Sequence, residues 1–590
     1  MIRQGETRPI DAAFSELMRR YSPDMSAAAQ DLIVELSQAL SLQHSCLDLS
    51  RRRKTLVKEL SGLSIVGDGQ VPTPLVLRDD QLYLHRYFQY ESSVARALIR
   101  RNRALPPQDH LGDQLEKYFG SAGGTINWQQ IAALQSQTQQ LTIITGGPGT
   151  GKTSTVAKIL SMLRENDTDM DIKLAAPTGK AAMRLAESIV QFLPNLPEDS
   201  RETIPTRVQT LHRLLGMRSN GRSFRYNRDN LISADVLIVD EVSMIDLTMM
   251  HRLLEALPAD TRLLLLGDPD QLPSVEAGNV LADLCRDRPG FSPAFADLCS
   301  KLLSVDVPTR KKQHALTDAI CHFETNYRFS MDQGIGQLAV NIQAGELTLL
   351  SSSDDEVSVY SLESLAQDRM RSEIASYYFE YEMLLQDPLS DAASLLSNFE
   401  STRILCPIRD GDLGVETLNR EIETHLEAQG LKASEQSFYH GRPIIITQND
   451  YNLGLFNGDI GICVNDAQDN QIKAAFMGPL GEIKLYLASR LPPHETCFAM
   501  TVHKSQGSEF SHVTLILPNP TSTLSEQLLT RELIYTAVTR ARHSMAIYAN
   551  EITWSAALQR SVRRMSGLSS MLEVGEVTEE LTDTQIDLFS

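Results

Sequence analysis

Short apolar runs alternate with amphipathic stretches along much of the chain. Between residues 125 and 285, Gly, Pro or an acidic residue directly follows each of the runs Leu141–Thr145, Lys173–Ala176, Val236–Val239 and Leu263–Leu266. Continuous hydrophobicity is typical of buried parallel strands, and such strands need helical crossovers. Similar strand candidates recur from about residue 320 to 435 and again after 495, at Arg403–Cys406, Val513–Leu517 and Met545–Tyr548. The pattern therefore predicts two α/β domains.

The rest of the chain has other patterns. Before residue 115, apolar residues recur at helical spacing, and residues 74–91 favour a hairpin that turns at Arg78–Asp80 and runs into a helix. Residues 440–493 are β-rich and punctuated by Asn-Gly and Gly, which indicates a small inserted β-barrel. We expect a helical N-terminal domain at 1–115, a first α/β domain at 116–320, a second at 321–439 and 494–570, an insertion at 440–493 and an acidic tail at 571–590.

Composition narrows the choice of partners. The 590 residues are 42% hydrophobic and 22% charged, as in a globular protein of several domains. The net charge of −20 argues against a surface that coats nucleic acid, so any such contact needs a local basic groove or a partner chain. We see no membrane-length apolar run and no apolar core of a signal peptide. The seven cysteines are scattered without a CxxC pair, which favours free thiols in the cytoplasm over a disulfide framework, zinc or iron–sulfur site.

One glycine-rich segment carries the strongest chemical signal. Residues 146–153, GGPGTGKT, fit the pattern G-x-x-x-x-G-K-[ST] between a strand and a helical segment. Glycines let backbone N–H groups cradle phosphates, and the following helix N-terminus favours their negative charge. Lys152 is expected to neutralise the β- and γ-phosphates and Thr153 to ligate Mg²⁺. The segment predicts ATP and Mg²⁺ as cofactors.

Further polar residues follow predicted strands downstream. Asp240 and Glu241 end the run LIVDE, where Asp240 can hold Mg²⁺ and Glu241 can polarise the attacking water. Gln271, in GDPDQ, is placed to sense a γ-phosphate, although an ordinary polar loop has the same pattern. Arg328 and Arg540 lie in the second α/β region, which suggests a nucleotide cleft between domains, because phosphoryl transfer gains from cations at the γ-phosphate. Tyr327 is either an adenine-stacking residue or an ordinary core or surface tyrosine.

Together, these segments resemble the motifs of superfamily 1 DNA helicases, and within them the RecD family. The matching segments are NWQQIAA (127–133), GGPGTGKTST, APTGKAAMRL (176–185), TLHRLLG (210–216), LIVDEVSM, GDPDQLPSVEAG, NYRF, AMTVHKSQGSEF (499–510) and ELIYTAVTRAR (532–542). The resemblance implies two RecA-like P-loop domains and makes the 440–493 insertion SH3-like.

The resemblance also assigns roles to residues. It implies that Lys152, Thr153, Asp240, Glu241, Gln271, Arg328 and Arg540 carry ATP hydrolysis, with Arg540 as the arginine finger. Gln129 would read the adenine, and the remaining nucleotide contacts would come from Gly146, Gly147, Pro148, Gly149, Thr150, Gly151, Ser154, Tyr327 and Glu509. Thr178, Lys180, His212, Thr501 and His503 would touch single-stranded DNA or couple it to ATP, although Thr and His are also common capping and packing residues.

The resemblance implies a 5′-to-3′ translocase and helicase subunit in a heterotrimer with RecB and RecC chains. Such an exonuclease V acts on DNA ends in double-strand break repair and in DNA degradation. No nuclease constellation is found in this chain. Two alternatives remain: a stand-alone RecD-like helicase, whose relatives carry a longer N-terminal region, and an ATP-driven switch or scaffold without unwinding. The N-terminal domain is either a unit that docks to partner chains or a plain accessory domain. Residues 216–230 are expected to form either a strand-separating pin or an ordinary exposed hairpin.

Overall fold

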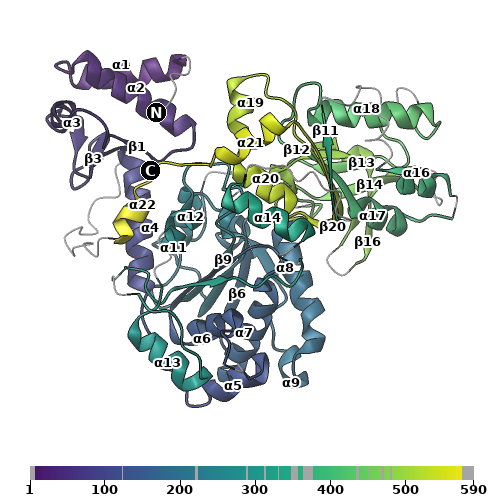
Figure 1. Cartoon of the computed structure of the whole chain (residues 1–590), viewed down its shortest axis with the longest axis horizontal. Helices are drawn as coiled ribbons and strands as arrows, with labels where there is room; N and C mark the ends of the chain where they lie inside the picture. Colours follow the sequence, from purple (N-terminus) through teal and green to yellow (C-terminus); the bar gives the residue numbers. More distant parts are fainter. Residues whose placement is uncertain are drawn as a thin grey trace.

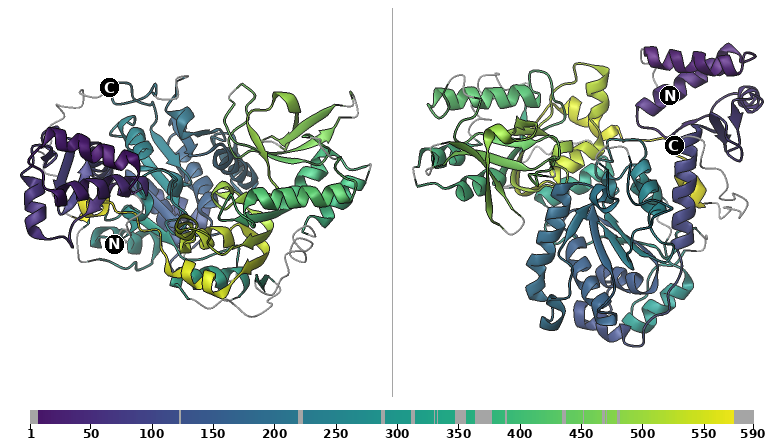
Figure 2. Two further views of the ribbon diagram at one scale, coloured as in Figure 1. Left: turned by 90° about the horizontal axis from the view of Figure 1, so that it is seen from above. Right: turned by 180° about the vertical axis from the view of Figure 1, so that it is seen from behind.

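The structure is a computed structural model with four β-sheets (Figure 1). The residues that it describes are 7–121, 124–218, 223–286, 290–310, 314–329, 331, 333–346, 356–362, 377–387, 389–433, 437–450, 452–466, 469, 471–478 and 481–573. The N-terminal helices and the β-rich insertion lie at opposite ends of the molecule, with the two α/β domains between them (Figure 2).

The first α/β domain is built on a six-stranded sheet. All its pairings are parallel, and the strand order is β10-β5-β9-β8-β6-β7. The strands are β5 (Leu141–Gly146), β6 (Ile172–Ala176), β7 (Val208–Thr210), β8 (Val236–Val239), β9 (Arg262–Gly267) and β10 (Ile320–Phe323). All four strands predicted for this domain are present. Strand β10 pairs with β5, so the expected boundary after residue 320 falls inside a strand of the first sheet.

Helices cover both faces of this sheet and bury two apolar cores. They are α5 (Leu111–Phe119), α6 (Trp128–Thr138), α7 (Lys152–Asn166), α8 (Gly179–Phe192), α9 (Glu198–Arg201), α10 (Leu211–Leu214), α11 (Leu247–Glu255), α12 (Val280–Cys285) and α13 (Pro293–Leu303). Between α10 and β8, Met217 and Phe224 form an antiparallel bridge. This bridge lies within the 216–230 segment for which a pin or a hairpin is predicted, and residues 219–222 of that segment lie outside the described residues.

The second α/β domain has a five-stranded parallel sheet of order β11-β20-β19-β12-β18. Its strands are β11 (Val357–Ser361), β12 (Thr402–Cys406), β18 (Ala499–Thr501), β19 (Phe510–Ile516) and β20 (Ala541–Ala549), which include the three predicted ones. Its helices are α14 (Gly334–Ala344), α16 (Phe379–Gln386), α17 (Ala392–Ser401), α18 (Val415–Ala428), α19 (Thr523–Leu528), α20 (Arg531–Val538) and α21 (Glu551–Gln559). One large core joins them.

An antiparallel sheet of order β16-β15-β14-β13-β17 is inserted between α18 and β18. Its strands are β13 (Pro443–Ile446), β14 (Ile460–Asn465), β15 (Ile472–Met477), β16 (Ile483–Leu487) and β17 (His494–Thr496). The β-rich insertion is therefore present, and β17 extends it just past residue 493. The two sides of the sheet contribute to different cores, one shared with the second domain and one local.

The N-terminal region combines α1 (Pro9–Tyr21), α2 (Ala27–Ser41) and α3 (Lys54–Ser61) with strands β1 (Cys46–Asp48), β2 (Val66–Gly67), β3 (Leu75–Arg78) and β4 (Gln81–Leu84). The predicted hairpin is confirmed, because β3 and β4 pair antiparallel. Both turn residues, Asp79 and Asp80, have positive φ (50° and 58°), as a tight right-twisted hairpin requires.

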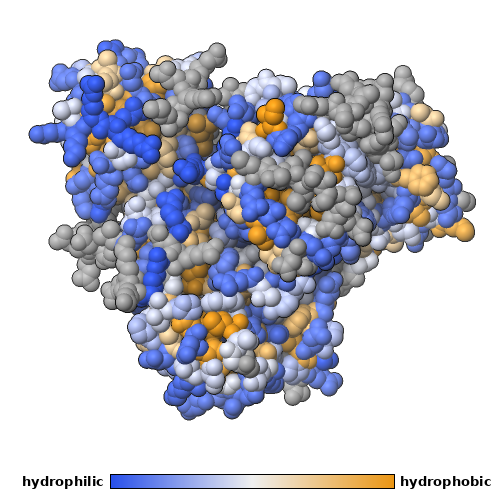
Figure 3. All heavy atoms as spheres, in the orientation of Figure 1, coloured by the Kyte–Doolittle hydropathy of each residue, from blue (hydrophilic) through white to orange (hydrophobic). Residues whose placement is uncertain are grey.

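The N-terminal region is packed onto the first α/β domain by the next helix, α4 (His85–Arg101), whose Val94 and Leu98 enter the core of that domain. Helix α22 (Leu568–Glu573) adds Leu568 and Leu572 to the same core. The expected tail begins inside α22, and its residues beyond 573 lie outside the described part. The face drawn in Figure 3 is mostly hydrophilic with small hydrophobic patches. Among the described residues, no helix is long and apolar enough to cross a membrane.

Candidate nucleotide and DNA site

The glycine-rich segment forms the loop between β5 and the start of α7. Gly149 and Gly151 have φ of 82° and 81°, in the left-handed region that favours glycine. A Cβ atom on Gly149 would lie 2.5 Å from the Cβ of Arg328, and one on Gly151 would lie 2.2 Å from the Nε2 of Gln129. A side chain at either position would therefore clash with a neighbouring residue. Glycine at both positions keeps the backbone of the loop accessible, as a loop that cradles phosphates requires.

Lys152 already points its ammonium group into the loop. Its Nζ donates to the carbonyl oxygens of Gly146 (2.6 Å) and Gly147 (3.0 Å). The Nε2 of Gln129 donates to the carbonyl of Thr150 at 3.1 Å, which places this amide against the loop. The hydroxyl of Ser154 donates to Gly151 at 2.9 Å, so in this structure it stabilises the first turn of α7. The Lys152 ammonium group thus lies against the first residues of the loop, and the Gln129 amide lies against Thr150 near its end.

Two acidic residues follow β8 beside this loop. Burial raises the pKa of Asp240 to about 7, and the negative charge of Glu241 adds to this effect. Glu241 has a φ of 53°, an uncommon conformation for a residue with a side chain. A carboxylate and a hydroxyl oxygen, here Asp240 and Thr153, are ligands that Mg²⁺ prefers, so the donor set fits this ion.

Gln271 and Arg540 join the two α/β domains by a direct contact. The Nη2 of Arg540 donates to the Oε1 of Gln271 at 2.9 Å, and both side chains are buried. Next to them, the hydroxyl of Tyr535 and the Nε2 of Gln271 both donate to the Oδ2 of Asp268, at 3.2 and 3.1 Å. Burial raises the pKa of Asp268 to about 6. The polar chain links the loop after β9 to α20 of the other domain.

Arg328 reaches a second interdomain cluster. Its Nη2 binds the Oε1 of Glu509 at 2.6 Å, while Arg542 binds the Oε2 at 2.8 Å and Arg184 of α8 lies 3.8 Å from the Oε1. Burial alone raises the pKa of Glu509, but the three guanidinium groups outweigh it and hold the pKa at about 2. Glu509 therefore bears its charge at neutral pH, and the cluster carries an excess of positive charge.

Tyr327 lies at the edge of the phosphate loop. Its backbone N–H donates to the carbonyl of Gly149 at 2.9 Å, and the side-chain amide of Asn326 donates to that of Pro148 at 2.8 Å. The Tyr327 side chain is 66% exposed, so it is not a core tyrosine. A flat exposed ring next to the phosphate loop fits a stacking role for a base.

Four of the five predicted DNA residues lie on two neighbouring loops. Thr178 caps α8 by accepting from the N–H of Ala181 at 3.2 Å, and Lys180 follows in the first turn. A Cβ atom on Gly507, just after η4 (His503–Ser505), would lie 3.6 Å from the Cβ of Ala181, which brings the loop after β18 close to α8. Partial burial lowers the pKa of Lys180 to about 8. His212 follows β7, whose Thr210 pairs with Ala176 at the end of β6, and its ring lies 6.1 Å from that of Phe224.

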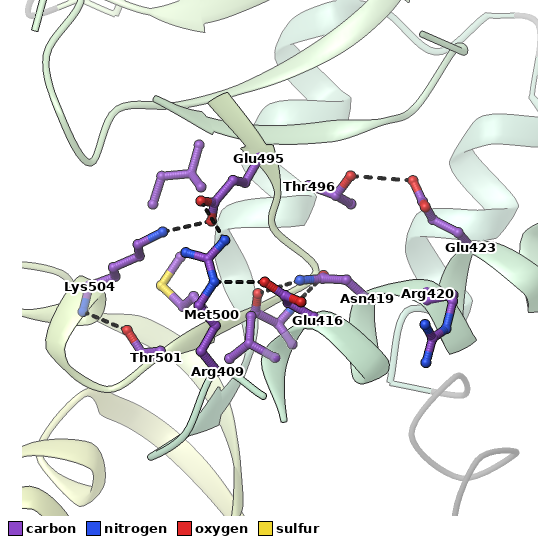
Figure 4. Close-up of a pocket in the computed structure, with 13 residues that line it drawn as sticks. Arg409, Glu416, Asn419, Arg420, Glu423, Glu495, Thr496, Met500, Thr501 and Lys504 are labelled. Carbon is purple, nitrogen blue, oxygen red and sulfur yellow. Dashed lines mark hydrogen bonds and ion pairs between the residues drawn. The ribbon is translucent and has the colours of Figure 1, made fainter. Parts of the chain in front are cut away.

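Thr501 also lines a pocket of about 290 Å³ between the second domain and the insertion (Figure 4). Arg409, Glu495 and Lys504 line the same pocket, and Glu495 pairs with Arg409 at 3.0 Å and with Lys504 at 2.8 Å. Arg409 and Lys504 are thus both bound to an acidic side chain in the present state. No group of three or more His, Cys, Asp or Glu side chains that could hold a metal occurs in the described ranges.

Sequence reasoning missed several residues of the site, among them Arg184, Asp268, Asn326, Tyr535 and Arg542. Each lies inside or next to a quoted motif, but a motif does not tell which residues of two distant segments meet. The only sequence signal for these residues was that each is polar or charged and lies inside or next to a motif.

Known proteins resemble the chain over most of its length. Two family models match: "AAA domain" over residues 129–277 and "UvrD-like helicase C-terminal domain" over residues 496–548. The RecBCD enzyme subunit RecD of Haemophilus influenzae is 37% identical and covers 85% of this chain and 81% of its own. The same-named subunit of Mycolicibacterium smegmatis is 37% identical with coverages of 85% and 84%.

Two further similarities are more distant. The ATP-dependent RecD2 DNA helicase of Deinococcus radiodurans is 30% identical and covers 82% of this chain, but only 58% of its own length is matched. A Bacteroides Pif1 helicase, solved with ADP-AlF3 and single-stranded DNA, has 18% identity and a TM-score of 0.37, with coverages of 72% and 92%.

A phosphate loop in one parallel-sheet domain, together with a second such domain whose arginine bonds to the first domain at the loop after β9, is the arrangement of an ATP-dependent helicase motor. The chain is an enzyme of this class. More narrowly, it belongs to the RecD family.

Proposed function

We propose that the chain is a 5′-to-3′ single-stranded DNA translocase and helicase that works as one subunit of a complex with RecB and RecC chains. The observation that carries the proposal is the 2.9 Å hydrogen bond between Arg540 and Gln271, because it joins the two motor domains at the nucleotide site. A γ-phosphate bound there acts on both domains at once, so its binding and loss change how they fit together.

Different residues of the site have different roles in ATP hydrolysis. Lys152 exchanges its two carbonyl partners for the β- and γ-phosphates, while Thr153 and Asp240 hold Mg²⁺. The ion, when bound, neutralises charge on the phosphates. Glu241 orients the attacking water, and Arg328 and Arg540 meet the negative charge that develops at the γ-phosphate. Gln129 and Tyr327 hold the adenine.

The DNA strand is proposed to cross both domains at the paired loops of α8 and β18. Thr178, Lys180, Thr501 and His503 are the candidate contacts, and non-specific binding of single strands needs such a basic groove with stacking side chains. Lys180 fits because burial and the nearby charge of Arg184 lower its pKa to about 8, and a DNA phosphate would counteract both by stabilising the charged ammonium group. His212 is the weakest candidate, since it packs on Phe224 instead.

A subunit role is supported over a stand-alone helicase. The identity is 37% to the RecD subunits of Haemophilus influenzae and Mycolicibacterium smegmatis, which are matched over 81% and 84% of their length, and 30% to the RecD2 helicase, which is matched over 58%. Helix α1 also exposes Ile10, Leu17 and Tyr21, whose spacing of seven and four residues puts them on one helix face. We place partner docking on the N-terminal domain. All seven cysteines are buried and described, and none of them is joined to another by a disulfide, which supports a reducing cytoplasm. In this setting the complex acts on DNA ends in break repair and DNA degradation.

The test is ATP-dependent unwinding of two duplexes, one with a 5′ and one with a 3′ single-stranded tail. The chain is assayed alone and with RecB and RecC partners, each time beside Lys152→Gln. Opening by the partners without this chain is measured separately and subtracted. The matched control is Lys173→Gln, because Lys173 pairs with Asp171 at 3.0 Å at the start of β6, away from the phosphate loop.

The proposal predicts that only the 5′-tailed duplex opens, that Lys152→Gln abolishes opening, and that Lys173→Gln does not. Strong activity of the chain alone would favour the stand-alone alternative. Hydrolysis of ATP without opening of either duplex in any mixture would favour an ATP-driven switch and refute the helicase role in this complex.

A further inference from the structure

A segment without helix or strand, residues 560–567, runs from the second α/β domain back to the N-terminal side (Figure 1, yellow trace toward the C label). Its first end is fixed to the start of α20. The backbone N–H of Arg531 donates to the carbonyl of Arg560 at 2.8 Å. The carboxylate of Glu532 accepts from the Ser561 hydroxyl at 2.6 Å and from the Val562 N–H at 2.9 Å. The same helix carries Tyr535 and ends just before Arg540.

The other end of the segment is fixed to the N-terminal region. The N–H of Ser45 donates to the carbonyl of Met565 at 3.0 Å. The buried carboxylate of Glu91 accepts from the Ser566 hydroxyl at 2.8 Å and from the Gly567 N–H at 3.0 Å. A Cβ atom on Gly567 would lie 1.9 Å from the Tyr83 hydroxyl oxygen, so the backbone itself packs on β4.

Between these anchors, Arg564 is buried to all but 9% of its surface and binds a loop of the first motor domain. Its Nη1 donates to the carbonyls of Glu276 (2.7 Å) and Gly278 (2.6 Å), and its Nη2 donates to the carbonyl of Ser274 and to the side chain of Gln43. A guanidinium offers five donors in a rigid fork, which is what three converging carbonyls require. Without it, the carbonyls of Glu276 and Gly278 would keep only the Ser274 hydroxyl, at 3.2 and 3.3 Å, and the Ser274 carbonyl would lose a charged donor.

The loop that Arg564 binds is the one that carries Gln271. Only two residues separate Gln271 from Ser274, and between them Leu272 is fixed on both sides: its N–H donates to the Thr536 hydroxyl and its carbonyl accepts from the Gln506 amide, each at 2.8 Å. One end of this short loop therefore meets Arg540, and the other end meets Arg564. Both arginines come from the chain segment that begins with α20.

We propose that Arg564 is a positioning residue for ATP hydrolysis: it fixes residues 274–278 and thereby holds Gln271 against Arg540. The proposal goes beyond the role as a DNA motor and needs only that the chain hydrolyses ATP. Arg564 itself does not reach the nucleotide, so it acts on the turnover step rather than on ATP affinity. Displacement of a catalytic group by even about 1 Å costs up to about 100-fold in rate.

The experiment measures steady-state ATP hydrolysis by the full chain at saturating single-stranded DNA, for Arg564→Gln, Gln271→Ala and the double variant. We expect Arg564→Gln to lower kcat about tenfold or more while KM for ATP changes less than about twofold. Arg564→Lys should fall between wild type and Arg564→Gln, because it keeps the charge but not the fork. In the Gln271→Ala background, Arg564→Gln should add less than about a twofold effect, since the two changes act through one contact.

The matched control is Arg101→Gln. Arg101 is equally buried and also donates to main-chain carbonyls, those of Leu257 and Pro258 at 2.9 Å, but these belong to another loop of the same domain. It should lower stability without the kcat loss. The proposal is overturned when folded Arg564→Gln keeps kcat within about twofold of wild type, or loses the same factor in both backgrounds. Should Arg564→Gln fail to fold, Arg564→Lys in the two backgrounds gives the same decision.

Discussion

Glu509 is predicted to be a major electrostatic anchor of the motor. Its side chain is 14% exposed and shares its two oxygens among Arg184, Arg328 and Arg542. These partners lower its pKa from 4.5 to about 2. One pKa unit corresponds to about 1.4 kcal/mol, so the charge of Glu509 contributes on the order of 3 kcal/mol to folding at pH 7.

The perturbation is Glu509→Gln, which keeps the shape and an acceptor oxygen but removes the charge. The folded-state pKa is depressed, so the unfolded chain binds more protons between pH 2 and 4.5, and the contribution of Glu509 is complete above about pH 5. We therefore expect Glu509→Gln to be less stable than wild type by about 3 kcal/mol at pH 7 and by about 1 kcal/mol at pH 3.

The two tryptophans of the chain provide the assay. Trp554 is buried in the core of the second domain, whereas Trp128 lies in the first. In a Trp128→Phe background, Trp554 fluorescence reports urea unfolding of the second domain alone. The control is Glu495→Gln: Glu495 also binds two cations, Arg409 and Lys504, but its side chain is 34% exposed, and such pairs are worth about 0–1 kcal/mol.

A loss of less than about 0.5 kcal/mol for Glu509→Gln at pH 7 would refute this reasoning, since it would equal an ordinary surface change. A stability difference between wild type and Glu509→Gln that grows as the pH falls would also refute it, because the pH dependence would then have the opposite sign.

Three further predictions concern close contacts and coupling. Gly149→Ala should weaken ATP binding at least about tenfold in a nucleotide titration, because its Cβ would lie 2.5 Å from that of Arg328 and would displace the phosphate loop. Gly120→Ala, with a similar φ of 78° but nothing within 4 Å, should cost only local strain of about 1 kcal/mol and leave ATP binding unchanged. Gly567→Ala should lower stability by about 1–3 kcal/mol in thermal unfolding, and adding Tyr83→Phe should recover part of it, because the Tyr83 hydroxyl is the nearest atom at 1.9 Å. Arg184→Gln should reduce the stimulation of ATP hydrolysis by single-stranded DNA several-fold, because Arg184 links α8 to Glu509. The control variant Arg201→Gln, which loses bonds to the carbonyls of Leu196 and Pro194, should keep the stimulation.

The sequence was most informative where one local rule decides the structure. Continuous apolar runs such as Val236–Val239 became parallel strands, because strands covered on both faces have no polar side. The turn at Asp79 and Asp80 followed from residues that tolerate positive φ. The phosphate loop was readable because its glycines, lysine and threonine lie within one short segment.

The sequence was least informative where distant segments meet. Strand β10 begins at Ile320 but pairs with β5 of the first sheet. The local sequence pattern does not show this, because the two strands are far apart along the chain. The partners of Glu509 come from three separate elements, and the carbonyls that bind Arg564 belong to a loop far from it along the chain. Such contacts depend on the packing of whole domains.

The most direct test of the central claim is displacement of streptavidin from single-stranded DNA biotinylated at one end. We predict that the chain, in its complex and after subtraction of what the partners do without it, displaces streptavidin from the 3′ end and not from the 5′ end, and only with ATP. Arg540→Lys should bind the same DNA but displace nothing, since a single ammonium group cannot replace the guanidinium that bonds Thr536, Ser508 and Gln271 at once. Displacement from the 5′ end, or undiminished displacement by Arg540→Lys, would contradict the account.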